Sequence, residues 1–80
     1  MHELSITRNV VAIVAEAAAQ RRVKKVTLEV GTQAGVMTDA IAFCFDVVAK
    51  GTAVEGAVLD ILVTQGTELK VRTMEVEEAA

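Results

Sequence analysis

The sequence predicts an α+β domain with the element order α-β-α-β-β, and three observations support this. Apolar residues recur at helical spacing in two segments, they alternate with polar residues in three others, and glycines separate most of these segments. The 80 residues have the length of one small domain, which we take as residues 1–80. The expected architecture is a three-stranded mixed sheet with two helices packed on it.

The first helix is predicted near the amino end. Ser5 is a candidate N-cap because its hydroxyl can accept a hydrogen bond from a free backbone N–H of the first turn. The apolar residues that follow at spacings of four, three and four are Ile6, Val10, Ile13 and Ala17. This spacing places them on one face of a helix that should end near Gln20.

The first strand and the second helix are predicted on either side of a loop at residues 31–36. Val26, Leu28 and Val30 alternate with polar residues, which is typical of a half-buried strand. After the loop, Thr38 is a candidate N-cap with Asp39 in the first turn. The residues that should line the buried face of this helix, before Gly51 ends it, are Ile41, Cys44, Phe45 and Val48.

Two further strands follow. In the first, the residues that share one side are Ala57, Leu59, Ile61 and Val63. The last runs from about Glu68 to Val76, and a bulge would explain why its alternation changes phase near Met74. The long crossover predicts that the first two strands are parallel, while the short final loop predicts an antiparallel hairpin between the last two.

Composition and charge limit the possible functions. The net charge is −3 and the basic residues form no cluster, so nucleic acid is not the expected partner. The longest apolar run, residues 10–15, is too short to cross a membrane, and no leader pattern precedes it, so a cytoplasmic location is expected. Cys44 is the only cysteine, which excludes an intrachain disulfide and a zinc site made of cysteines.

The terminal residues Met1 and His2 could form a chelate. The α-amine of Met1, the deprotonated amide of His2 and the His2 imidazole can bind one ion in fused rings, leaving a fourth position open. Tetragonal nitrogen sites suit Ni(II) and Cu(II). The alternative is that His2, like most terminal residues, has no function. Because His2 is the only histidine, acyl-transfer chemistry would have no base, and we do not expect an enzyme.

Other polar residues have a structural interpretation beside a functional one. Cys44 lies between apolar neighbours and is expected in the core. Asp46 could form a local cap or pair. Glu3 and Glu16 could supply oxygen ligands or a partner-binding patch, or simply face solvent. The GTQAG segment at residues 31–35 lacks the lysine of a phosphate-binding loop.

Four stretches, in order, resemble the HypA/HybF family of nickel metallochaperones. They are MHELSI, LEVGTQAGV, FCFDVVAKGT with EGAVLDI, and TELKVRTMEVE. The resemblance implies a role in inserting nickel into [NiFe]-hydrogenase, or in some organisms urease. It also implies Ni(II) bound at Met1 and His2 with Glu3 assisting, a HypB-type GTPase partner and a hydrogenase large subunit as recipient. Arg8 and Glu16 on the first helix are then the expected docking positions for the GTPase.

The sequence departs from the family pattern at two places. Family members carry a zinc module with two CxxC pairs, which is missing here with a deletion point near residues 61–63, so no zinc is expected. Many relatives have an acidic residue where this chain has Met37, so a supporting carboxylate would come from Glu3 or Asp39.

Loss of the zinc module leaves a second functional hypothesis open. An apolar strip should then be uncovered on the outer face of the sheet, formed by Val58, Leu62 and Met74. Such a strip is a candidate self-association surface, and the chain a possible homo-oligomer. The alternative function is therefore a metal-independent docking or dimerisation module that binds the maturation GTPase.

Overall fold

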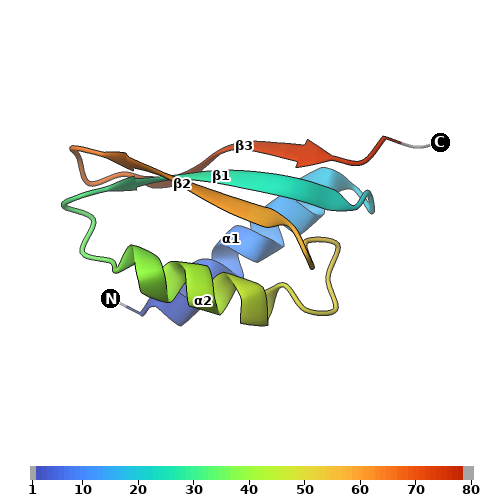
Figure 1. Cartoon of the computed structure of the whole chain (residues 1–80), viewed down its shortest axis with the longest axis horizontal. Helices are drawn as coiled ribbons and strands as arrows, with labels where there is room; N and C mark the ends of the chain where they lie inside the picture. The colour runs from blue at the N-terminus through green and yellow to red at the C-terminus, as the bar shows by residue number, and fades with distance from the viewer. Residues whose placement is uncertain (1, 79–80) are drawn as a thin grey trace.

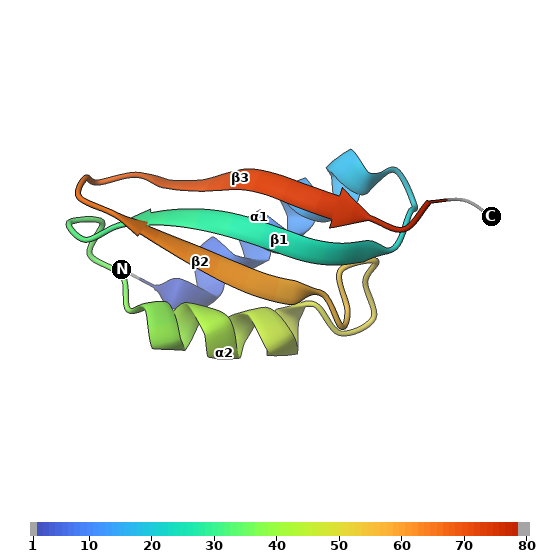
Figure 2. The ribbon, with the colours of Figure 1, turned by 45° about the horizontal axis from the view of Figure 1, so that its top comes forward.

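Both helices lie on the same face of a three-stranded sheet (Figures 1 and 2). The computed structural model describes residues 2–78. In chain order, its elements are α1 (Glu3–Ala18), β1 (Val23–Gly31), α2 (Thr38–Val48), β2 (Val58–Thr64) and β3 (Leu69–Val76). The predicted fold class and element order are confirmed.

The strand order in the sheet is β2-β1-β3. Strand β1 runs parallel to β2, with Leu28 opposite Ile61, and antiparallel to β3, with Val30 opposite Leu69. The predicted parallel crossover and mixed sheet are confirmed. The predicted hairpin between the last two strands is wrong, because β1 lies between them.

A short connection is enough to cross β1, which explains why the predicted hairpin between β2 and β3 is wrong. Strands β2 and β3 are about 10 Å apart, at twice the usual strand spacing. The four linking residues, 65–68, can span about 13 Å when extended. They cross the end of β1. The N–H of Gly31, the last residue of β1, donates to the Glu68 carbonyl at 2.7 Å, and the N–H of Gln33, just beyond the strand, donates to the Gly66 carbonyl at 2.9 Å.

Gly31 is required at this crossing. A Cβ atom at residue 31 would lie 2.9 Å from the backbone N of Thr67 and closer still to the Gly66 carbonyl. Those neighbours are backbone atoms of the connection itself, so they cannot move aside as a flexible side chain would. Glycine at the end of β1 therefore allows the chain to pass directly over the strand.

Strand β3 contains the predicted bulge. Thr73 pairs with Thr27 and Val71 pairs with Leu28, so Arg72 is the extra residue. The bulge reverses the alternation, and Met74 consequently packs against the core together with Val71. The expectation that Met74 lies on the outer face is therefore wrong.

The helices start earlier than predicted. His2, rather than Ser5, is the N-cap of α1, and Met37, rather than Thr38, is the N-cap of α2. Helix α1 ends at Ala18, after which Ala19 and Gln20 both have positive φ angles, of 52° and 72°. Both N-caps have extended backbone angles, so neither helix depends on a serine or threonine at the predicted cap.

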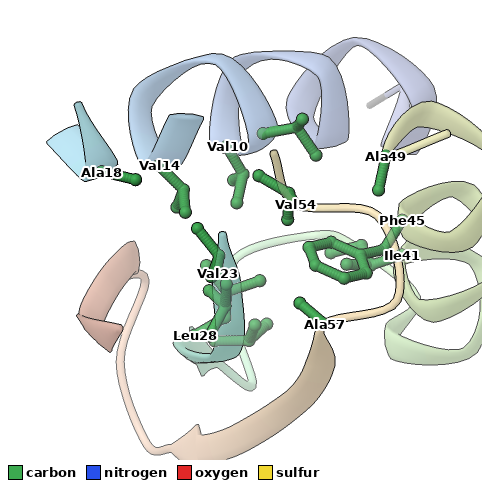
Figure 3. Packing of buried hydrophobic residues seen from close by; sticks show 13 residues of the cluster. Val10, Val14, Ala18, Val23, Leu28, Ile41, Phe45, Ala49, Val54 and Ala57 are labelled. Atoms are coloured by element: carbon green, nitrogen blue, oxygen red, sulfur yellow. The ribbon is translucent and has the colours of Figure 1, made fainter. Parts of the chain in front are cut away.

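The core lies between the helices and the inner face of the sheet (Figure 3). Its largest fully buried side chains are Phe45, Leu28 and Ile41. The predicted face of α1 is only partly correct, because Ile13 and Ala17 are exposed. The buried residues of α1 are Thr7, Val10, Val11, Val14 and Ala18. Helix α1 has apolar residues on several sides. It packs against α2 as well as the sheet, so the side that faces these neighbours is the one that is buried.

The two phenylalanines of α2 offer a test of this packing. Phe45 is 1% exposed and Phe43 is 71% exposed. We expect Phe45→Ala to lower the free energy of unfolding by about 3–5 kcal/mol, and Phe43→Ala by less than about 0.5 kcal/mol. Urea denaturation followed by circular dichroism measures both. Equal effects of the two substitutions would contradict the described packing.

Candidate metal centre

The amino ends of α1 and α2 lie side by side (Figures 1 and 2). One hydrogen bond joins them, because the backbone N–H of Met37 donates to Glu3 Oε2 at 3.1 Å. A second bond holds the first turn of α1, in which the buried Thr7 hydroxyl donates to the Glu3 carbonyl at 2.6 Å. Glu3 therefore connects the start of the chain to the start of α2.

His2 is well placed to bind a ligand. Its side chain is exposed, and its carbonyl accepts the first helical hydrogen bond, from Ile6 N at 3.2 Å. The N–H groups of the first residues of a helix have no carbonyl partner within it. A metal that replaced the amide proton of His2 would therefore break no hydrogen bond of the helical ladder. Met1, the other predicted ligand, lies outside the described residues.

The Glu3 carboxylate is electrostatically stabilised where it lies. The hydrogen bond from Met37 N–H holds the pKa of the Glu3 carboxyl below its usual value, and the backbone N–H of Glu3 itself adds to this. Oε2 of the carboxylate is thus committed to the amino end of α2. Glu3 is next to His2 in the chain, but the contact that its carboxylate makes in the structure is the one with the backbone of Met37.

The other candidate residues are more dispersed. Asp39 is exposed in the first turn of α2, where its charge complements the positive end of the helix dipole. Between residues 2 and 78, no group of three or more His, Cys, Asp and Glu side chains could hold a metal ion.

The remaining predicted residues have the following positions. Cys44 is half-buried on α2, between Ile41 and Phe45 in the core and the exposed side of the helix. Arg8, Glu16 and Asp46 are exposed. Across the described residues, none of the helices is long and apolar enough to span a bilayer.

Sequence reasoning missed a charged cluster on the outer face of the sheet. Glu29 on β1 is only 7% exposed, and it pairs with Arg72 and with Lys70 at 3.5 Å, both on β3. The hydrogen bond from Arg72 holds the pKa of the Glu29 carboxyl below its usual range. Alternation in β1 correctly assigned Glu29 to the outer face. Its burial follows from the central position of β1, which alternation does not reveal.

The structure is a small α+β domain with an exposed histidine at the N-cap of its first helix. Residues 1–68 match the family model described as "Hydrogenase/urease nickel incorporation, metallochaperone, hypA". The chain therefore belongs to the HypA family.

Individual relatives agree with this assignment. The chain is 41% identical to the hydrogenase maturation factor HypA of Trichodesmium erythraeum, over 98% of this chain and 97% of that protein. It is 39% identical to HypA of Rippkaea orientalis over the same shares. The solution structure of the Ni metallochaperone HypA from Helicobacter pylori has the same fold, with a TM-score of 0.72 at 14% identity, covering 98% of this chain and 95% of that one.

The Glu3 contact predicts a pH-dependent stability. Because folding lowers the pKa of Glu3, its carboxylate adds stability above the unfolded value of 4.5, and this is lost as the pH falls through the lower folded pKa. We expect Glu3→Gln to be less stable than the wild type at neutral pH, and the difference to disappear in acid. Urea denaturation over a pH series measures it.

Glu16→Gln is the matched control, because Glu16 is an exposed carboxylate on the same helix. Glu16→Gln and the wild type should have nearly the same free energy of unfolding at every pH. A Glu3→Gln variant as stable as the wild type at neutral pH would show that the contact with Met37 contributes nothing.

Proposed function

We propose that this chain is a nickel-binding accessory protein for the maturation of [NiFe]-hydrogenase, and that it binds Ni(II) through Met1 and His2. The observation that carries the proposal is the position of His2, an exposed imidazole on the N-cap of α1 whose amide lies before the helical ladder. Membership of the HypA family, described by nickel incorporation, supports the choice of metal.

The proposed ligands are three nitrogens: the α-amine of Met1, the deprotonated amide of His2 and the His2 imidazole. All three must be free of their protons to bind, so binding releases protons. The positive ends of both helix dipoles favour the loss of the amide proton. The fourth position stays open, which allows the nickel to be passed to an acceptor, and Glu3 Oε1 is close enough in sequence to assist.

We also propose that residues 1–80 form a single nickel domain without the family's zinc module. The alignment with the Trichodesmium protein has 111 positions for an 80-residue chain, so at least 31 positions of the relative have no counterpart here. Strand β2 runs without interruption through residues 61–63, the proposed deletion point. The buried core consists of residues from the two helices, the central strand and the segment between α2 and β2, which supports folding without zinc.

The proposed partners are a HypB-type GTPase and the hydrogenase large subunit. Arg8 and Glu16 are exposed on α1, the helix that begins at the proposed nickel site, and this supports α1 as the docking face for the GTPase.

One observation favours the alternative function, a metal-independent dimerisation or docking module. Strand β2 is at the edge of the sheet and exposes Val58 and Val63, at 61% and 58%, with Asp60 as its only charged residue. The other edge, β3, carries a bulge and several charges, which are the usual protection against pairing with another chain.

The nickel proposal predicts that a free terminus is essential. We expect His2→Ala to abolish the d–d absorption of a planar Ni(II) complex, and a short histidine-free extension before Met1 to do the same, because it converts the amine into an amide. Binding should also weaken as the pH falls, since the donors become protonated. Equal nickel affinity with and without the extension would show that the amine is not a ligand.

The alternative predicts self-association through β2. If it holds, the wild type dimerises in sedimentation equilibrium at high concentration and Leu62→Lys is monomeric. Ile13→Lys is the control, because it changes an exposed apolar residue on α1 that is remote from the edge strand in sequence and element. A wild type that stays monomeric would rule out dimerisation and leave only docking to the GTPase.

A further inference from the structure

Met37 is an exposed methionine at the metal-binding end of the molecule. It is 68% exposed, whereas Met74 packs against the core. Exposure of a methionine gives up its contribution to packing but makes the thioether sulfur available to a ligand. Its position, as the N-cap of α2, is fixed by the hydrogen bond to Glu3.

We propose that Met37 and His2 together form a site for Cu(I) that is distinct in its donors from the nickel chelate. Glu3, which contacts the backbone of Met37 at 3.1 Å, is the residue next to His2, and consecutive Cα atoms are only about 3.8 Å apart. Both side chains are exposed. The two residues are the N-caps of α1 and α2, and the amino ends of these helices lie side by side (Figure 2).

The donor types select the metal. A thioether is a soft ligand that favours Cu(I), and an imidazole binds copper well. Neither group needs the deprotonated amide that Ni(II) requires.

The charges around the site also favour a monovalent ion. Two helix N-termini meet there, and each contributes a partial positive charge of about half a unit. The repulsion of a bound cation grows with its charge, so neutral donors at this place hold a +1 ion more readily than a +2 ion. The Glu3 carboxylate, which accepts the Met37 N–H, partly offsets the helix charges.

The Cu(I) site shares His2 with the proposed nickel site but does not use the terminal amine. Changing the amine therefore distinguishes the two sites experimentally. The test uses the untagged full chain, with ascorbate under anaerobic conditions, and measures Cu(I) affinity by competition with the chromophoric chelator bicinchoninate. Ni(II) binding is measured on the same samples by absorption.

We expect Met37→Leu to weaken Cu(I) binding by about tenfold or more, because loss of a direct donor should cost at least as much as loss of a residue that supports one, and to leave Ni(II) binding unchanged. Leucine keeps the backbone N–H that donates to Glu3, so the fold should be retained, which circular dichroism checks. Met74→Leu, the matched control on the inner face, should leave the binding of both metals unchanged.

The histidine-free extension gives the second comparison. It should remove Ni(II) binding and preserve Cu(I) binding, while His2→Ala should remove both. Equal Cu(I) affinity for Met37→Leu and the wild type, or loss of Cu(I) binding on extension, would overturn the proposal. Failure of the wild type to bind Ni(II), with Cu(I) binding sensitive to Met37→Leu, would reject the nickel function and retain this site.

Discussion

Strand β1 is paired on both edges, and most of the structure depends on this constraint. Its inner side chains, Val26 and Leu28, are fully buried beneath the helices, and its outer Glu29 is buried among side chains of β3. A strand with hydrogen-bonded neighbours on both sides cannot shift by one residue without turning its apolar side chains outward. The parallel β2 and the antiparallel β3 are both aligned to this strand.

The central position of β1 also determines where the amino ends of the two helices lie. The chain leaves β1 at Gly31, beneath the connection between β2 and β3, and reaches the start of α2 within a few residues. This brings Met37 to the first turn of α1, where Glu3 accepts its N–H. The exposed His2 is thereby held beside a second helix end rather than at an isolated terminus. The positive ends of both helix dipoles therefore lie near the exposed imidazole.

Glu29 shows how the same constraint accommodates a charge. A carboxylate that is nearly excluded from water is tolerated only when it is paired, and Arg72 and Lys70 provide the pairing. Arg72 is also the extra residue of the bulge in β3. The bulge therefore coincides with the contact that neutralises Glu29, and it turns Met74 toward the core at the same time.

The sequence by itself determined the five elements, the parallel crossover and the presence of a bulge, because these follow from local alternation, helical spacing and connection length. It also indicated the terminal Met1 and His2 as a possible chelate, since that site is contiguous in sequence. It did not determine that β1 separates β2 from β3, because four linking residues are long enough either to turn back or to cross a strand. Nor did it place Met37 beside Glu3 or bury Glu29. Those contacts join residues 34, 41 and 43 positions apart, and only the packing of the helices and strands around β1 brings them together.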